Sequence, residues 1–289
     1  MRKASAEIKL ETYEDILGIG DLKADQVVDI PLHKLQAFKN HPFHVYDDEK
    51  MQETVESIQR HGVLCPAIVR PKANGFYEII SGHRRKRGCE LAGKRVLPAL
   101  VRDYTDEEAT IVMVDANIQR EDILPSEKAW AYRMKMEAMK HQGIKGSDGQ
   151  AAELVGKKAG ESGRTVQRYI RLTELLPALL LWVDDGMIKF MAGVHLSYLT
   201  QEEQGWVFQC ANEIGSGVKE DVTRQLKKYS EEKKLTQLAV KLLLTEKPEK
   251  PVHVTLKGDK IKKYFPREFS QQQIEEVIYS LLDEWKKAQ

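Results

Sequence analysis

A strand, a glycine and a strongly basic helix follow one another in the first third of the chain, and this stretch constrains the fold most. Residues 76–80 are apolar and β-prone and predict a strand, which Gly82 ends. Residues 83–92 predict a short helix that stops at Gly93. The four cations at 84–87 fall in its first turn, where the helix dipole is already positive. A bound polyanion would resolve this conflict between the four cations and the positive end of the helix dipole. Backbone N–H groups at a glycine-opened helix start, beside arginines, are typical of a phosphate cradle. The alternative is a solvated basic surface turn.

The residues around this stretch predict a small α/β domain over residues 25–118. The aspartates at 47–48 precede a helical pattern that ends at Gly62, and a capping box at 105–108 opens another helix. Short strands alternate with these helices, as in α/β domains. The further predicted strands are residues 27–30, 67–70 and 96–101.

After Arg120 almost every segment predicts a helix, so residues 119–245 form a predicted all-helical domain. Residues 151–172, AAELVGKKAGESGRTVQRYIRL, have the small residues and tight glycine turn of a helix-turn-helix, preceded by a loop at 144–149. An ordinary helical hairpin with a solvated polar face is the alternative. Arginine and glutamine on an outer face read base edges, and threonine and arginine also hold phosphates. The candidate DNA-binding residues are Ser162, Arg164, Thr165, Gln167, Arg168 and Arg171.

The two ends of the chain differ from these domains. Residues 1–24 are polar and predict a flexible arm, and the charged, proline-bearing residues 246–251 predict a linker. Residues 252–257 alternate as a half-buried strand, and Ser270 caps a helix with an apolar stripe. One strand and one helix cannot close a core, so residues 252–289 must dock on the rest of the chain or pair with a second copy.

Composition excludes several classes of protein. The net charge is only +1, yet residues 84–102 hold seven cations against one glutamate, which indicates a focused anion site. Three distant cysteines without a C-x-x-C pattern argue against zinc or a disulfide framework and fit the cytoplasm. No stretch has the length of a signal peptide or a membrane span. His41 and His44 form an H-x-x-H without a third ligand, so we interpret them as surface residues.

Three ordered boxes resemble those of the ParB/RepB/Spo0J partition proteins. SGHRRKRG at 81–88 resembles the GERRxRA box, and IQRHGVLCPAIVR at 58–70 resembles the first nucleotide box, usually GxxQP before a strand. DANIQRED at 115–122 resembles the ENLQRxD box. Two departures stand out, because His83 and Ala116 occupy positions where the family has Glu.

The resemblance covers about residues 28–200 and implies an α+β multidomain fold. A small α/β domain of the ParB and sulfiredoxin type would bind CTP with Mg²⁺, ahead of an all-α helix-turn-helix domain and a small C-terminal β-α segment. It further implies a palindromic double-stranded DNA site, a homodimer that CTP closes into a clamp, and a ParA-type ATPase as candidate partner. The location would be nucleoid-associated, in partition of a chromosome, plasmid or mobile element. The implied nucleotide-binding residues are Gly62, Pro66, Ser81, Gly82, His83, Arg84, Arg85, Asn117 and Arg120, with Asn117 also on the metal side.

The two departures modify this expectation. In the family, the Glu replaced by His83 supports hydrolysis, and the Glu replaced by Ala116 helps to hold Mg²⁺. Asp115 is a poor substitute because the next residue on a helix points about 100° away. We therefore expect CTP binding with weak metal dependence and at most weak CTPase activity. A protonated His83 would add positive charge and tighten binding at lower pH.

Two other functions stay open. One is a transcriptional regulator that has kept the fold and lost the nucleotide switch, with a vestigial pocket. The other is a sulfiredoxin-like phosphotransferase, whose catalytic Cys would lie in the basic loop. In this chain that loop has Ser81 and no Cys before Cys89.

Overall fold

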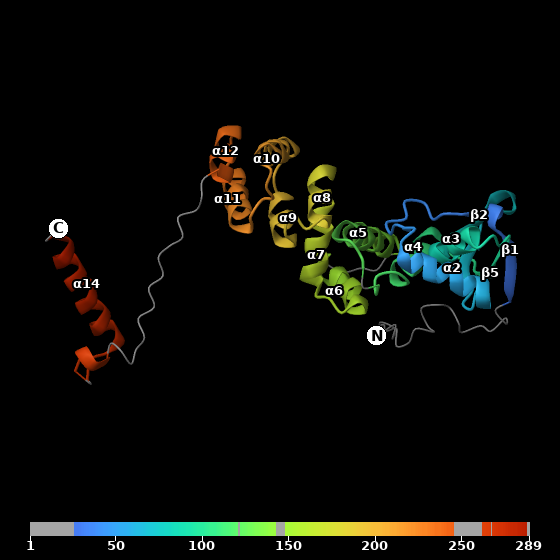
Figure 1. Ribbon diagram of the computed structural model, residues 1–289, viewed down its shortest axis with the longest axis horizontal. Helices are drawn as coiled ribbons and strands as arrows, with labels where there is room; N and C mark the ends of the chain where they lie inside the picture. The colour runs from blue at the N-terminus through green and yellow to red at the C-terminus, as the bar shows by residue number, and fades with distance from the viewer. Residues whose placement is uncertain (1–25, 121, 143–147, 246–261, 267, 288–289) are drawn as a thin grey trace, which may run out of the picture. The chain divides into compact units, whose positions relative to one another are not determined.

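The computed structural model (Figure 1) describes residues 26–120, 122–142, 148–245, 262–266 and 268–287. It comprises two compact units, residues 1–245 and residues 246–289. The predicted arm at 1–24, the linker at 246–251 and the strand at 252–257 lie outside the described residues.

A five-stranded mixed sheet opens the first unit, with the strand order β1-β5-β3-β4-β2. The pairs β1–β5 and β3–β4 are antiparallel, whereas β3–β5 and β2–β4 are parallel. Sequence predicted four of the strands. It missed β2, since two residues are too short to show an alternating pattern. The strands are β1 (Val27–Pro31), β2 (Leu35–Gln36), β3 (Ala67–Pro71), β4 (Tyr77–Ser81) and β5 (Val96–Val101).

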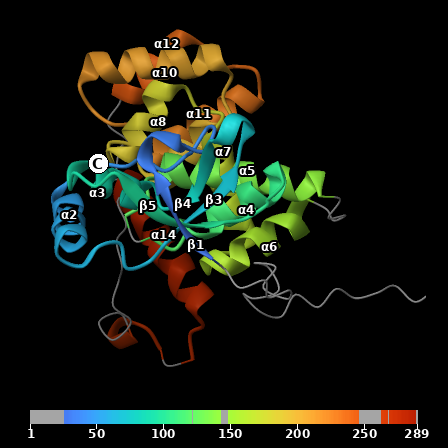
Figure 2. The same ribbon diagram turned by 90° about the vertical axis from the view of Figure 1, so that its right-hand side faces the viewer.

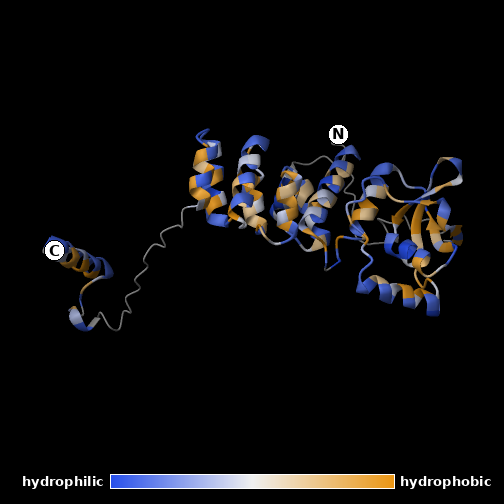
Figure 3. Ribbon diagram, turned by 45° about the horizontal axis from the view of Figure 1, so that its top comes forward, coloured by the Kyte–Doolittle hydropathy of each residue, from blue (hydrophilic) through white to orange (hydrophobic). Residues whose placement is uncertain are grey.

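Helices cover both faces of this sheet. Ile79 and Ile80 are adjacent and fully buried, yet they belong to different apolar clusters, because successive side chains of a strand point to opposite faces. Ile79 faces α2 (Glu49–His61) and α3 (His83–Leu91), while Ile80 faces α4 (Asp106–Asp115). Figure 2 shows α2 and α3 on one side of the strands and α4 on the other. In Figure 3 the strands are mostly apolar, and α2 shows both colours, as expected for a helix with one buried face.

Local signals set the helix ends. The Asp48 carboxylate accepts a hydrogen bond from the Met51 N–H at 2.8 Å, and Gly62 ends α2 with φ of 73°. The predicted capping box is confirmed at α4, where the Thr105 hydroxyl accepts from the Glu108 N–H (3.2 Å) and the Glu108 carboxylate from the Thr105 N–H (2.9 Å).

The helices that follow share two apolar clusters, one joining α4 to α5, α6 and α7 and one joining α7 to the later helices. The core therefore continues across the predicted boundary between 118 and 119. The predicted loop at 144–149 is wrong for its last two residues, because α6 begins at Asp148. Ala151 and Ala152 are buried, and their apolar burial favours a helix that starts just ahead of them. The helices are α5 (Pro125–His141), α6 (Asp148–Ala159), α7 (Gly163–Leu172), α8 (Pro177–Asp184), α9 (Phe190–Leu196), α10 (Gln201–Ile214), α11 (Glu220–Glu231) and α12 (Gln237–Thr245). Single 3-10 turns are Leu32–Lys34, Ala73–Gly75 and Lys262–Tyr264.

The second unit contains α14 (Gln271–Lys287). Ser270 caps it as predicted, since its hydroxyl accepts from the Gln273 N–H at 3.4 Å. Within this unit, Leu281 and Trp285 are more than half exposed. Among the described helices, none is both long and apolar enough to cross a membrane.

Candidate nucleotide and DNA-binding sites

The basic helix α3 begins at a position that only glycine fits. Gly82 has φ of 116°, which side-chain-bearing residues rarely adopt. A Cβ atom there would lie 2.8 Å from the Cβ of Ala67 and 3.3 Å from the Cζ of Arg85. The turn after β4 is thus pressed against the start of β3. We call Ser81, Gly82, His83, Arg84 and Arg85 the cradle.

Two aspartates just ahead of α2 pair with cations at 84–87. Arg84 lies 3.4 Å from the Asp48 carboxylate, and Arg87 donates to Asp47 at 3.0 Å. The hydrogen bond from Arg87 lowers the pKa of Asp47, and that from the Met51 amide, with the Arg84 charge, lowers the pKa of Asp48. The fold therefore supplies two anions of its own just ahead of α2, and these partly offset the unfavourable placement of the cations at the positive end of the α3 dipole.

Arg85 faces inward and ties the first nucleotide box to α3. Its guanidinium donates to the carbonyls of Cys65 (2.9 Å) and Pro66 and to the Ser81 hydroxyl (3.3 Å). Burial lowers the pKa of Arg85. These hydrogen bonds bring together three of the candidate nucleotide residues, Pro66, Ser81 and Arg85. Gly62 lies at the end of α2, with no atom within 4 Å of a Cβ added there.

His83, the first residue of α3, is held as a neutral imidazole. Its Nε2 accepts a hydrogen bond from the Phe38 N–H at 3.3 Å. Burial, with the neighbouring His41 and Lys86, lowers the pKa of His83 to about 3. In the chain without a ligand, the site therefore disfavours the protonated form of His83, and tighter nucleotide binding at lower pH stays a prediction.

His41 is the residue that sequence reasoning placed wrongly. It is a neighbour of the cradle instead of a surface residue, with its ring centroid 3.9 Å from that of His83. Phe38 and Phe43 are both buried and draw the intervening segment onto the sheet domain. In the sequence, the phenylalanines on either side of residues 39–42 were the signal that could have placed His41 against the sheet domain.

The His41–His83 pair predicts a pH-dependent stability. Folding lowers the pKa of both groups below the ordinary value of 6.5, so the folded state binds fewer protons than the unfolded chain below that pH. The stabilisation is complete above pH 6.5 and is lost as pH falls toward 3. Between pH 6.5 and 5, His83 alone is expected to cost about 2 kcal/mol of unfolding free energy. Urea titrations at each pH measure this. His83→Gln, which keeps an acceptor for Phe38, should flatten the slope, and an equal slope in both proteins would contradict the assignment.

The third box follows α4. The Asn117 side-chain amide donates to the Met113 carbonyl at 2.8 Å, which fixes its orientation. The charge of Arg120, after burial, contributes to the lowered pKa of His41, the residue that neighbours His83.

Residues 115–117 at the start of the third box offer no free carboxylate for a protein-held Mg²⁺. Ala116 offers no oxygen ligand, and Asp115 is engaged by Lys135 and, at 2.9 Å, by Lys158. Mg²⁺ usually needs one or two carboxylates besides phosphate and water. No group of three or more His, Cys, Asp or Glu side chains in the described part of the chain could hold a metal ion.

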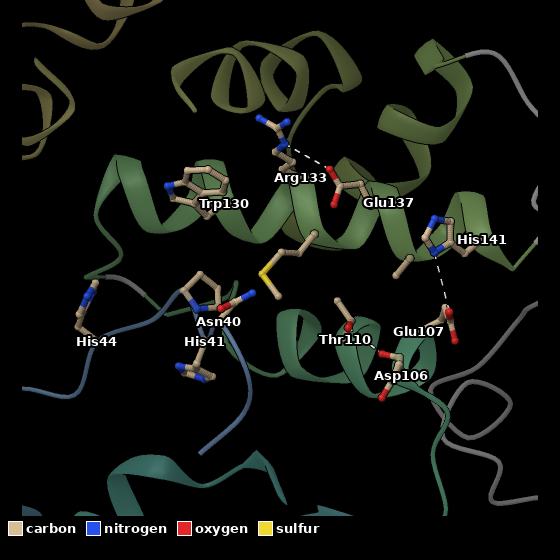
Figure 4. Close-up of a pocket in the computed structure, with 13 residues that line it drawn as sticks. Asn40, His41, His44, Asp106, Glu107, Thr110, Trp130, Arg133, Glu137 and His141 are labelled. Carbon is tan, nitrogen blue, oxygen red and sulfur yellow. Dashed lines mark hydrogen bonds and ion pairs between the residues drawn. The ribbon is translucent and has the colours of Figure 1, made fainter. Parts of the chain in front are cut away.

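A hollow of about 590 Å³ lies between residues 40–44, α4 and α5 (Figure 4). Its carboxylates are paired within the chain, as in the contacts of Glu137 with Arg133 (3.2 Å) and Glu107 with His141 (3.9 Å). His41 belongs to this lining and also contacts the cradle residue His83. The hollow therefore adjoins the histidine pair without containing the basic residues of α3.

The turn between α6 and α7 is fixed on both sides. The Ser162 hydroxyl accepts from the Thr165 N–H at 3.2 Å and so caps α7. The Glu153 carboxylate accepts from the Gly163 N–H at 2.7 Å. Glu161 accepts hydrogen bonds from two side chains of α5, Tyr132 (2.9 Å) and Lys128 (2.7 Å). The second helix of the predicted helix-turn-helix is thus held rigidly.

The outer face of α7 carries the candidate base-reading side chains. Val166 is fully buried, whereas Arg164 and Gln167 are exposed and Arg168 is half-exposed. Neither arginine forms an ion pair with a residue that the structure describes. This face therefore presents two cations and an amide to solvent.

Arg171 differs from these residues. Its guanidinium donates to the Ser197 carbonyl and lies 4.3 Å from the centre of the Tyr198 ring. Lys227 lies over the same ring at 3.6 Å. Arg171 thus joins the end of α7 to the end of α9, a contact that sequence spacing cannot show.

Comparison with known proteins gives the family. The model of the ParB N-terminal domain matches residues 19–118. The chromosome-partitioning protein Spo0J of Thermus thermophilus is 32% identical over 194 residues, which are 67% of this chain and 68% of that protein. The probable chromosome 1-partitioning protein ParB of Deinococcus radiodurans is 34% identical over 197 residues, 68% of this chain and 64% of that protein. The chain therefore belongs to the ParB and Spo0J family of chromosome-partitioning proteins.

Two solved structures are also similar to this chain. C-terminally truncated ParB of Caulobacter crescentus, complexed to the centromeric parS site, is 22% identical, covers 70% of this chain and 98% of its own, and has a TM-score of 0.45. The same protein complexed with CTP-gamma-S is 24% identical over 61% of this chain and 94% of its own, with a TM-score of 0.31.

Proposed function

We propose that this chain is a sequence-specific DNA-binding partition protein whose affinity for DNA is switched by a cytidine triphosphate. The observation that carries the proposal is the cradle. Gly82 opens α3 with its backbone N–H groups uncapped by a side chain, and Ser81 and Arg84 stand beside them. The Spo0J and ParB relatives act in chromosome partition.

The DNA-binding part of the proposal rests on α7. Its exposed arginines and Gln167 would read a short palindromic site of double-stranded DNA. A palindrome calls for a homodimer, and the exposed apolar residues of α14 would contribute to its interface. A ParA-type ATPase is the candidate motor partner, and the location would be the nucleoid.

Metal dependence gives a prediction. We expect calorimetry to detect CTP binding, with at most a few-fold loss of affinity when Mg²⁺ is removed by EDTA. The reason is that Ala116 has no carboxylate and that lysines engage the carboxylate of Asp115. Phosphate release should be slow or absent. Ala116→Glu, which adds the missing carboxylate, should increase the effect of Mg²⁺. An affinity that disappears without Mg²⁺ in the unaltered protein would contradict this account.

One observation favours a second function, a transcriptional regulator without a nucleotide switch. Arg85 already satisfies the carbonyls of Cys65 and Pro66, so a structural role explains its presence. The phosphotransferase is not favoured, because Cys89 is buried and burial raises the pKa of its thiol, which disfavours a nucleophilic thiolate.

One experiment separates the three functions. Genomic DNA fragments are retained on the immobilised full chain with and without CTP, and the bound fragments are sequenced. We expect one palindromic site to be enriched and its retention to change with CTP. Enrichment indifferent to CTP supports the regulator, and phosphate transfer without a DNA complex supports the enzyme.

A further inference from the structure

The imidazole of His41 has one satisfied and one unsatisfied nitrogen. Its Nδ1 lies 2.7 Å from the Phe43 carbonyl oxygen. Because a carbonyl only accepts, Nδ1 carries the proton and Nε2 has a free lone pair. Nε2 is buried, and within the described residues no hydrogen-bond partner meets it. A buried acceptor without a donor is unfavourable and rare, so a donor from outside these residues is called for.

The position of this atom indicates where the donor comes from. The His41 ring packs against the His83 ring of the cradle at a tilt of 43°, and the charge of Arg120 acts on it. In Figure 4 the ring is turned away from Trp130 and therefore from α5. The Nε2 of His83 is already occupied by the Phe38 N–H. His41 thus provides a free acceptor beside the proposed nucleotide site.

The chemistry of the ligand decides which of its groups can donate a hydrogen bond to the Nε2 of His41. Phosphate oxygens of a triphosphate are largely unprotonated at neutral pH and cannot donate to a lone pair. A nucleotide offers two kinds of donor, the sugar hydroxyls and the exocyclic amine of the base. We propose that His41 is a specificity-determining residue of the nucleotide site and that its Nε2 accepts a hydrogen bond from one of these donors. The inference rests on the proposed function and names a residue outside the three sequence boxes.

The surroundings keep this acceptor available. Burial lowers the pKa of His41, so the ring is neutral at physiological pH. The Phe43 carbonyl fixes the tautomer, because it needs the proton on Nδ1. A ligand without a donor at this point leaves Nε2 unpaired and binds more weakly.

Calorimetry on the full chain with CTP, 2′-deoxy-CTP and UTP tests the inference. The unaltered protein should bind CTP about fivefold more tightly than one of the two analogues, as expected for one neutral hydrogen bond. A loss with 2′-deoxy-CTP identifies the sugar 2′-hydroxyl, and a loss with UTP identifies the amine. His41→Phe keeps a ring against His83 and removes the acceptor. This variant should bind CTP about fivefold more weakly than the unaltered protein does, and it should bind the disfavoured analogue as tightly as CTP. His41→Gln, which keeps an acceptor, should restore part of the discrimination.

The discrimination between ligands is the decisive readout, because a merely structural role for His41 would weaken all three alike. His33→Phe, on an exposed histidine of the same domain, is the matched control and should bind as the unaltered protein does. Discrimination that persists in both His41→Phe and His41→Gln, or equal binding of all three nucleotides by the unaltered protein, overturns the inference. An unaltered protein that binds no nucleotide refutes the proposed function itself.

Discussion

Replacing Gln167 and Arg168 together by alanine is expected to remove most sequence-specific DNA binding. Each side chain that reads a base edge with two hydrogen bonds contributes about 1–3 kcal/mol of discrimination, so the pair should cost about 2–6 kcal/mol if the two act independently. The reason lies in α7, where Gln167 is exposed and Arg168 half-exposed while Val166 anchors the helix in the core. Fluorescence anisotropy on the enriched fragment and on a scrambled fragment measures the difference.

Matched variants make this prediction specific. Arg224→Ala removes an exposed arginine that pairs with Glu220 on α11 and should leave the ratio between the two fragments unchanged. Arg171→Ala should weaken both fragments alike and lower the melting temperature, because Arg171 joins α7 to the end of α9. Equal losses on specific and scrambled DNA for the Gln167 and Arg168 double variant would contradict base reading.

The substitution Gly82→Ala is expected to reduce the unfolding free energy by about 2–6 kcal/mol and to remove nucleotide binding. Two costs add at this position. Alanine at φ of 116° is strained, by about 1–3 kcal/mol. Its Cβ would also lie 2.8 Å from the Cβ of Ala67, which forces α3 and β3 apart at a further cost of about 1–3 kcal/mol. Urea denaturation with calorimetric CTP titration measures both effects.

Gly75→Ala separates the two costs. Gly75 also has a positive φ, 73°, but no atom lies within 4 Å of a Cβ added there. This variant should lose only about 1 kcal/mol and keep CTP binding. An equal loss of unfolding free energy in Gly75→Ala and Gly82→Ala would mean that the close approach of α3 to β3 adds nothing to the cost of the Gly82 substitution.

Sequence predicted those parts of the structure that local signals determine. Asp48 and Gly62 bound α2, and Gly82 ends β4 and opens α3, because capping and backbone conformation depend on a few neighbouring residues. The resemblance to partition proteins located the cradle and was confirmed by the family relationship.

Contacts between distant residues were not predictable in this way. Arg87 meets Asp47, and Arg171 meets Ser197, because the tertiary fold brings them together. The same holds for His41, whose place beside His83 depends on two buried phenylalanines. Charge and histidine patterns gave the residue types at the site, whereas their pairing and protonation followed from burial.

The most direct test of a nucleotide-switched DNA clamp is retention of the full chain on DNA that carries the enriched site, measured on a closed circle and on the same DNA after linearisation. We predict that CTP increases retention on the circle at high salt and that cutting the circle releases the protein, because a closed ring leaves a linear molecule only at its ends. The account would be contradicted if CTP left retention unchanged on both the closed circle and the linear DNA.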